Sequence, residues 1–145
     1  MYELRKATSQ DAAAIRRLIW LVQINPTGLN WRHFRVAVGS DGQVIACGQI
    51  KPHAGNLLEL ASIAVRPEFR SMGIARKIIG QLLDETPSPH YLYCRSQLQP
   101  FYERFGFSVC VSDDIPPYFR RVWSIARWVQ RVTRSHESLL VMYRS

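Results

Sequence analysis

The stretch from Val65 to Ile79 holds the residues whose types and spacing most favour a chemical function. It reads as the end of a strand, a tight basic turn and the start of a helix. Such a turn leaves backbone N–H groups unpaired at a helix N-terminus, where the helix dipole also attracts anions. Arg70 adds a full positive charge, and Gly73 lacks the Cβ that would keep a ligand away from the backbone. The pattern therefore predicts a site for a phosphate-bearing ligand.

Size and composition limit what the rest of the chain can be. The 145 residues are 47% hydrophobic, enough for a single domain over residues 1–145 with a real core. No run of about 18 apolar residues is present, and the first residues are typical of a strand rather than of a signal peptide. The cysteines Cys47, Cys94 and Cys110 are odd in number and lack C-x-x-C spacing. These features argue against a disulfide framework and a zinc site, and they predict a cytoplasmic protein.

The net charge of +8 is concentrated in one segment. Five of these charges come from arginines between residues 116 and 135, where no acidic residue occurs, and the remainder of the chain carries only +3. A local basic feature is present, whereas the broadly basic surface expected of a nucleic-acid-binding protein is not indicated. The arginines of this segment are Arg120, Arg121, Arg127, Arg131 and Arg134.

The spacing of apolar residues predicts the element order β-α-β-β-β-α-β-α-β-α-β. Asp41-Gly42 is typical of a hairpin turn, and Pro87 is expected to stop the helix that starts after Gly73. We therefore expect an α/β fold with one mixed sheet flanked by helices. The predicted strands cover residues 2–7, 34–38, 44–50, 57–65, 91–94, 107–111 and 139–143, and the predicted helices cover about 9–22, 74–85, 97–104 and 118–133.

Two motifs in this context point to a known family. Arg70-x-x-Gly73-x-Ala75 follows a strand that ends in Ile63-Ala64-Val65, and it opens a helix. The run from Phe101 to Phe107 reads Phe-Tyr-Glu-Arg-Phe-Gly-Phe. The first is similar to the acyl-CoA pyrophosphate signature of the GNAT superfamily of N-acetyltransferases, and the second resembles its helix-to-strand motif. The resemblance covers residues 1 to about 111. It implies the GNAT fold, a mostly antiparallel central sheet with splayed middle strands.

The resemblance implies acetyl-CoA as co-substrate. Ile63 and Val65 stand where the family pairs strand backbone groups with the pantetheine arm of CoA. The Ile63 N–H stands where family members polarise the thioester carbonyl, as an oxyanion hole does. The turn amides would hold the pyrophosphate, and Arg76 either meets an outer phosphate or faces solvent. The implied acetyl-CoA-binding residues are Ile63, Ala64, Val65, Arg70, Ser71, Met72, Gly73, Ile74, Ala75, Arg76 and Tyr102.

The catalytic residues implied by the resemblance are Glu59 and Tyr102, together with the Ile63 amide. Glu59, four residues before Ile63, stands where several family members place a general base. Its alternative roles are to bind the ammonium group of the substrate or to pair with an arginine. Tyr102 stands where many family enzymes protonate the leaving thiolate, and alternatively its ring packs and contacts the sulfur without transferring a proton. Cys94 lies near the implied CoA cleft, but direct transfer needs no thiol nucleophile.

The chain departs from the family pattern by an insert of about 25 residues between Val111 and Leu139. The insert contains a predicted basic amphipathic helix at about 116–135, which could cap the sheet with its basic face in solvent. The alternatives are a helix on an anionic membrane surface, a wall of the acceptor site, or a dimer contact. The apolar positions at helical spacing are Phe119, Val122, Trp123, Ala126 and Val129.

The residues and the resemblance together predict an acetyl-CoA-dependent N-acetyltransferase that moves an acetyl group directly to a primary amine of a small molecule or protein. Segments 25–28 and 59–65 further resemble small members from cyanobacteria and plastids. Two alternatives stay open: a non-catalytic acyl-CoA-binding module, and a membrane or nucleic-acid binder acting through the arginine-rich helix. A homodimer is compatible with the family. No metal is expected, because the histidines lack metal-ligand spacing and are expected at the surface: His33, His53, His90 and His136.

Overall fold

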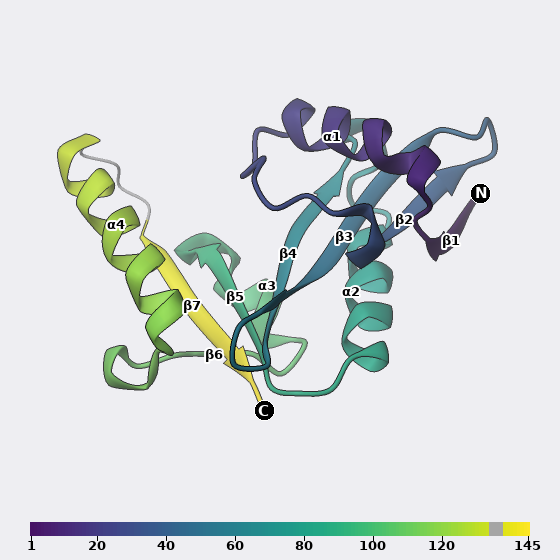
Figure 1. Ribbon diagram of the computed structural model, residues 1–145. Helices are drawn as coiled ribbons and strands as arrows, with labels where there is room; N and C mark the ends of the chain where they lie inside the picture. Colours follow the sequence, from purple (N-terminus) through teal and green to yellow (C-terminus); the bar gives the residue numbers. More distant parts are fainter. Residues whose placement is uncertain (134–137) are drawn as a thin grey trace. The chain divides into compact units, whose positions relative to one another are not determined.

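The computed structural model describes residues 1–133 and 138–145, except for the side chains of Ser112 and residues 126–133 (Figure 1). The described chain forms two compact units, Met1–Pro87 and Ser88–Ser145. Each unit combines antiparallel strands with helices, which confirms the predicted α/β class. Within the described residues, no helix is both long enough and apolar enough to cross a bilayer.

The first unit is built on a four-stranded antiparallel sheet in the order β1-β2-β3-β4. Strands β2 and β3 form the predicted hairpin, whose turn is closed by a 2.8 Å hydrogen bond from the Gly39 N–H to the Gln43 carbonyl. The predicted strand at residues 57–65 and the helix after Gly73 are confirmed. The elements are β1 (Tyr2–Lys6), α1 (Ala12–Leu21), β2 (Phe34–Gly39), β3 (Val44–His53), β4 (Leu57–Val65) and α2 (Ile74–Glu85).

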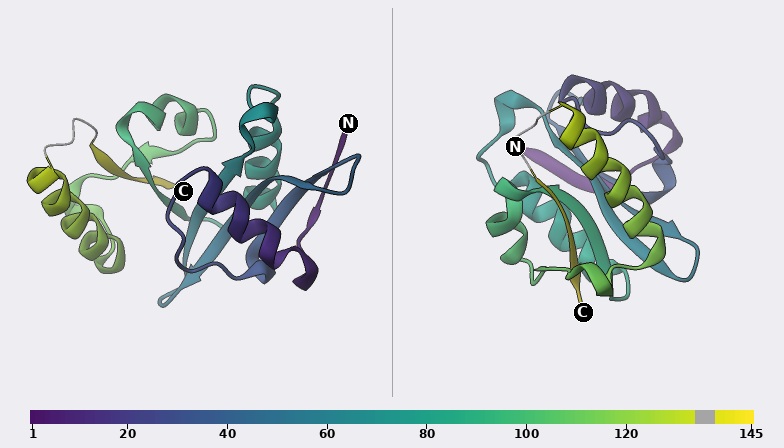
Figure 2. Two further views of the ribbon diagram at one scale, coloured as in Figure 1. Left: turned by 90° about the horizontal axis from the view of Figure 1, so that it is seen from above. Right: turned by 90° about the vertical axis from the view of Figure 1, so that its left-hand side faces the viewer.

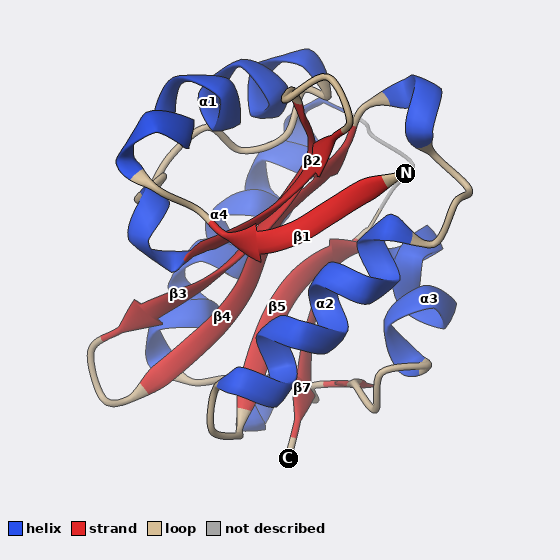
Figure 3. Ribbon diagram, turned by 90° about the vertical axis from the view of Figure 1, so that its right-hand side faces the viewer, coloured by secondary structure: helices blue, strands red, loops and turns tan. Residues whose placement is uncertain are grey.

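Helices α1 and α2 cover opposite faces of this sheet (Figure 3). Ile15 of α1 belongs to one buried cluster with Cys47 of β3, whereas Ile78 of α2 lies against Gly48, the next residue of β3. Successive residues of a strand point to opposite faces, so the two helices cannot share a face. A Cβ on Gly48 would lie 2.6 Å from Ile63 Cδ1 and 2.9 Å from Ile78 Cγ2. Only glycine therefore lets α2 and β4 pack this closely over β3.

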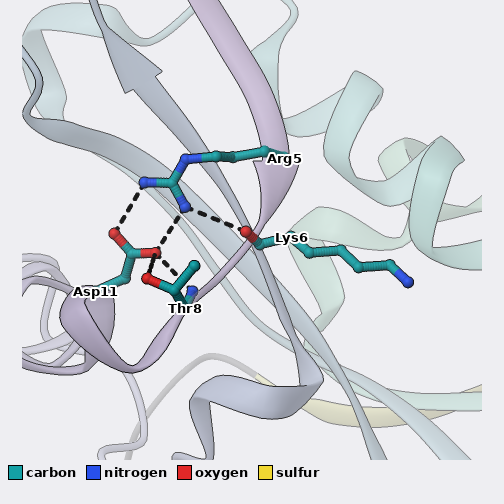
Figure 4. Close-up of polar contacts among 4 residues, drawn as sticks. All are labelled: Arg5, Lys6, Thr8 and Asp11. Atoms are coloured by element: carbon teal, nitrogen blue, oxygen red, sulfur yellow. Dashed lines mark hydrogen bonds and ion pairs between the residues drawn. The ribbon is translucent and has the colours of Figure 1, made fainter.

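The approach to α1 is fixed by an ion pair between Arg5 of β1 and Asp11 (Figure 4). The guanidinium of Arg5 donates to both carboxylate oxygens of Asp11, at 2.7 and 3.0 Å. The Thr8 N–H donates to the same carboxylate at 2.7 Å, which satisfies an amide at the start of the helical segment. The hydrogen bond from Arg5, outweighing the opposing effect of burial, lowers the pKa of Asp11. The first helix, predicted over about residues 9–22, begins with the 3-10 turn Ser9–Asp11 and continues as α1 from Ala12.

Asp11→Asn is expected to destabilise the protein by about 1–2 kcal/mol at pH 7, as measured by urea unfolding. The figure is modest because the Arg5 side chain is one third exposed, so solvent screens the pair. A lowered folded-state pKa contributes stability above the unfolded-state value, and that contribution is lost as pH falls through the folded value. The difference in free energy of unfolding between wild type and variant should therefore disappear at acidic pH. Asp41→Asn, in an exposed turn, is the control; equal effects of the two changes at pH 7 would contradict the assignment.

The second unit has three antiparallel strands in the order β5-β7-β6, as far as it is described. Helix α4 packs along β7 (Figures 1 and 2). Phe119 of α4 is fully buried, with its ring 5.0 Å from that of Tyr91, and the Trp123 indole N–H donates to the Leu139 carbonyl at 3.0 Å. The elements are β5 (His90–Arg95), α3 (Gln99–Glu103), β6 (Ser108–Val109), α4 (Pro117–Thr133) and β7 (Leu139–Arg144).

Several details of the prediction for this unit were wrong. Val122, predicted in the buried stripe of the basic helix, is 39% exposed, because the sheet-facing side is set by Phe119 and Trp123. His90, predicted at the surface, is fully buried. The predicted strand 107–111 is shortened to β6, and the predicted helix 97–104 divides into a 3-10 turn, Ser96–Leu98, and α3. The following predicted positions lie outside the described side chains: Ala126, Arg127, Val129, Arg131, Arg134 and His136.

Candidate active site

The turn before α2 has the backbone geometry of an anion site. Ser71 and Gly73 both adopt left-handed conformations, with φ of 66° and 77°. Gly73 is the residue that caps α2, and its missing Cβ would project into open space, with no atom within 4 Å. The positive φ explains why glycine stands here, and the open space is where a ligand would meet the backbone. Left-handed residues in a turn are typical of nests, the concave arrangements of backbone N–H groups that bind anions.

The amides of this turn are free to bind an anion. The first backbone hydrogen bond at the start of the helix runs from the Lys77 N–H to the Gly73 carbonyl, at 3.2 Å. Within the described chain, the N–H groups of residues 71–76 make no backbone hydrogen bond. Because α2 is 12 residues long, its dipole adds to the positive potential at this end. The turn thus fits a pyrophosphate group by the chemistry of its donors.

The side chains around the turn divide into exposed and buried ones. Arg70 and Arg76 are exposed, whereas Ile74 is buried and anchors the first turn of α2 in the core. Lys77 is also exposed, and its ammonium group lies 5.4 Å from the ring centroid of Tyr2. The exposed predicted residues of the turn are Arg70, Ser71, Met72, Gly73 and Arg76.

Strand β4 leads into this turn and contains a β-bulge next to Ile63. Cys47 of β3 pairs with Ala64, but Gln49 pairs with Ala61, so β4 has one extra residue in this interval. Ser62 absorbs the irregularity with a φ of 58°. A bulge rotates the backbone locally and re-aims its polar groups. The predicted pantetheine and oxyanion residues, Ile63 to Val65, therefore follow directly on a distorted section of the strand.

Gln49 stabilises the bulge through hydrogen bonds from its side-chain amide. Its side chain is fully buried, and its Nε2 donates to the Ser62 hydroxyl at 2.8 Å and to the Gly28 carbonyl at 3.2 Å. Lys51, two residues further along β3, donates from its ammonium group to the Thr27 carbonyl at 3.1 Å. The segment around residues 27–28, which follows α1, is thereby tied to β3 and to the bulge of β4.

Glu59 lies on the same face of the sheet as these groups. It is directly opposite Lys51 in the register of β3 and β4, and only 7% of its surface is exposed. Its Oε1 lies 2.8 Å from Nε2 of His53. Glu59, Ile63 and the amide-lined turn therefore occur along one continuous segment of strand and turn in the first unit.

Tyr102 belongs to the second unit, on α3. Its side chain is largely buried, and its ring is held edge-on by Phe101 at 5.0 Å and by Phe107 at 6.2 Å between centroids. Burial, with a smaller effect of the Cys94 thiolate, raises the pKa of Tyr102 to about 12. The phenol is therefore protonated at any physiological pH.

Two side chains near Glu59 were not predicted from the sequence to lie there. His53 was predicted at the surface, but its side chain is only 15% exposed and contacts Glu59. Gln49 was not singled out at all. The alternation of β3 places Cys47, Gln49, Lys51 and His53 on one face, which was the available signal. The alternation along β3 does not predict which residue of β4 each of these side chains contacts.

The cysteines of the described chain are free and buried, and they are expected to be unreactive in the native protein. Burial raises the pKa of Cys47 to about 12 and that of Cys94 to about 11. Less than about 0.1% of either thiol is then ionised at pH 7.5, and thiolate is the reactive form. Titration with a disulfide reagent should give slow modification of the folded protein and three fast equivalents in urea. Fast modification of Cys94 in the folded state would contradict this and reopen a nucleophilic role.

Structural comparison finds solved proteins with the same fold. N-acetylglutamate synthase from Neisseria gonorrhoeae, complexed with coenzyme A and N-acetyl-glutamate, gives a TM-score of 0.75 at 20% identity, over 99% of this chain and 35% of that chain. Rv2747 from Mycobacterium tuberculosis, in complex with CoA, gives 0.70 at 21% identity, over 96% and 97%. Escherichia coli ElaA gives 0.69 at 15% identity, over 100% of both chains. The chain spans about a third of the synthase, and likeness at these identities establishes the fold alone.

Sequence comparison identifies the family. A search of curated proteins finds no significant match. The model of the acetyltransferase (GNAT) family matches residues 3–107, which is more than half of the chain and includes β4, the amide-lined turn and the Phe101–Phe107 motif. The chain belongs to the acetyltransferase (GNAT) family.

Proposed function

We propose that this chain, acting as a single acyltransferase domain over residues 1–145, is an acetyl-CoA-dependent N-acetyltransferase whose acceptor is a primary amine. The observation that carries the proposal is the turn of residues 70–76, with two left-handed residues and a run of amides free of backbone partners. This turn suits the pyrophosphate of CoA. It continues from a strand that holds a nearly buried carboxylate, Glu59, on its α1-covered face. Solved proteins of the same fold carry coenzyme A, which supports the choice of ligand.

In the proposed reaction, the amine nitrogen attacks the thioester carbonyl carbon directly. A C–N bond forms, the C–S bond breaks, the attacking nitrogen loses its second proton to solvent, and the sulfur leaves as the CoA thiolate. The carbonyl oxygen becomes negatively charged on the way, and the Ile63 N–H is proposed to donate to it. A fixed donor aimed at developing charge lowers the barrier without reorganising. Because the donor is a backbone group, replacing the Ile63 side chain would leave it in place.

Glu59 is proposed to remove the proton of the acceptor ammonium. A primary amine with a pKa near 10.4 is only about 0.04% neutral at pH 7, and only the neutral form attacks. A carboxylate at the acceptor site both attracts the ammonium form and takes its proton, directly or through a water molecule. The low exposure of Glu59 favours this role, because a carboxylate in bulk water would be screened.

Tyr102 is proposed as the group that meets the leaving sulfur, on the strength of its place in the family motif. Its pKa of about 12 lies well above the value near 8.5 of a free thiol, so full transfer of its proton to a thiolate would cost roughly 5 kcal/mol. Donation of a hydrogen bond carries no such cost. We therefore assign Tyr102 the stabilisation of the thiolate by its O–H, with solvent supplying the proton after release.

The proposal is tested by titrating acetyl-CoA into the purified protein in a calorimeter, followed by an assay of CoA release with a panel of amines. The panel should contain polyamines, amino acids, aminoglycosides and a peptide with a free N-terminal amine. Micromolar binding and release of CoA that depends on one amine would support the proposal. Binding without transfer to any amine would instead favour an acyl-CoA-binding module. A folded protein that binds no acetyl-CoA would overturn the proposal and direct attention to anionic surfaces, tested by salt-dependent binding to anionic vesicles.

A further inference from the structure

Oε1 of Glu59 lies within hydrogen-bond distance, 2.8 Å, of Nε2 of a specific neighbour, His53. The two residues stand on opposite strands of the β3–β4 hairpin, which is closed by the turn at residues 54–56. In the register, His53 lies opposite Leu57 and Lys51 lies opposite Glu59, so His53 and Glu59 are diagonal neighbours on one face. Diagonal pairs are within reach of long side chains. The short turn fixes this register, so the pairing is built into the hairpin.

His53 and Glu59 meet where both side chains are largely removed from solvent. The exposed fractions of the two side chains are 15% for His53 and 9% for Glu59. A carboxylate this far removed from water depends on protein donors for its orientation. Within the described residues, His53 is the one hydrogen-bond partner of the Glu59 side chain. Lys51, the cation directly opposite, is turned instead toward the Thr27 carbonyl.

We propose that His53 is a positioning residue for acyl transfer: its Nε2–H holds Oε1 of Glu59, so that Oε2 is presented to the ammonium group of the acceptor. The inference rests on the proposed function, in which Glu59 takes the proton of the amine. The carboxylate of an unrestrained glutamate rotates about its last torsion, and each misplaced orientation takes the base out of reach. The bond requires the tautomer that carries hydrogen on Nε2, which then donates to the ionised carboxylate.

The test compares His53→Ala with His53→Gln, because a glutamine side chain can place an amide N–H near the position of Nε2. With the amine found in the CoA-release assay, we expect His53→Ala to lower kcat about 10- to 100-fold while the Kd for acetyl-CoA stays within about threefold. His53→Gln should recover at least about fivefold of that loss. His33→Gln, in the 3-10 turn Trp31–His33, is the control for a histidine replacement away from the hairpin. Circular dichroism establishes that each variant is folded.

The Glu59→Gln background separates positioning from general damage. If His53 acts through Glu59, then adding His53→Ala to Glu59→Gln should lower kcat no further. A loss of the same size in both backgrounds, or a His53→Ala enzyme with full kcat, would overturn the inference. If His53→Ala does not fold, His53→Gln carries the kinetic comparison with wild type, and a kcat of His53→Gln equal to that of a folded His53→Asn would count against a donor near Nε2.

A spectroscopic readout is independent of turnover. In nitrogen-15 spectra of the wild type, we expect a ring N–H of His53 that exchanges slowly with solvent, and its exchange should accelerate in Glu59→Ala. If the wild type shows no slowly exchanging ring N–H of His53, the hydrogen bond between His53 and Glu59 is overturned, whatever the activity of the protein. A slowly exchanging proton in a wild type that transfers acetyl to no amine would instead show that the proposed function has failed although the pair exists. The two failures are thereby distinguished.

Discussion

Replacing Gly73 by aspartate is expected to abolish acetyl-CoA binding at micromolar concentrations. The new carboxylate would project from the Cβ position into the open space that faces the amides of residues 71–76. A charge about 5 Å from the pyrophosphate would repel it by roughly 3 kcal/mol at an effective dielectric constant of 20, which corresponds to about a 100-fold weaker Kd. Calorimetric titration of acetyl-CoA measures this directly.

Gly73→Asn is the matched control for that experiment. Asparagine has nearly the same shape as aspartate, and it tolerates the left-handed conformation that Gly73 adopts at a φ of 77°. Both variants should therefore lose a similar amount of stability, about 1 kcal/mol, but only aspartate adds negative charge. We expect the asparagine variant to bind acetyl-CoA at least about 30-fold more tightly than the aspartate variant. Equal affinities of the two variants would show that the ligand phosphates lie elsewhere.

Glu59→Gln is expected to lower kcat about 100- to 1,000-fold at pH 7.5, with the Kd for acetyl-CoA changed by less than about threefold. Glutamine keeps the size of the side chain and an acceptor oxygen for His53, so the hairpin should remain intact. Without a base, the reaction depends on amine that is already neutral. At pH values below the pKa of the amine, this neutral fraction increases tenfold for each unit by which the pH increases. The kcat of the variant should therefore increase steeply at alkaline pH, and the ratio of wild-type kcat to variant kcat should become smaller. Initial rates of CoA release between pH 6.5 and 9.5 measure both effects.

Glu103→Gln on α3 is the control for loss of a carboxylate, because Glu103 is exposed. A Glu59→Gln protein with wild-type kcat but a raised KM for the amine would contradict the role of a base. That outcome would instead identify Glu59 as an anchor for the substrate ammonium, the role left open by the sequence. Loss of kcat with a pH profile parallel to that of wild type would also count against proton removal by Glu59.

The amide-lined turn could be predicted because its parts are contiguous in the chain. Alternating apolar residues up to Val65, a turn with Arg70 and Gly73, and helical spacing after Ile74 are all local signals. The structure places the ends of β4 and the start of α2 where these signals put them. Local sequence sets backbone dihedrals within a few residues, and a helix N-terminus needs no distant partner to expose its amides.

The contacts around Glu59 could not be predicted in the same way. His53 is six residues from Glu59, yet their meeting depends on the register set by the turn between β3 and β4. Gln49 reaches Ser62 because β4 has an extra residue at the bulge, which no periodic pattern announces. The burial of His90 and the exposure of Val122 likewise depend on what packs against each side chain.

The sequence by itself determined the order of strands and helices, the place of the amide-lined turn and, through the two motifs, the family. Each of these features depends on residues that are close in sequence, whose steric and hydrogen-bonding preferences act over one turn or one strand. Only the tertiary structure decided that Gly48 packs against Ile63 and Ile78, that Gln49 ties the bulge to the segment after α1, and that His53 contacts Glu59. These contacts join different elements, and their geometry follows from strand register and close packing of the core, which many residues fix together.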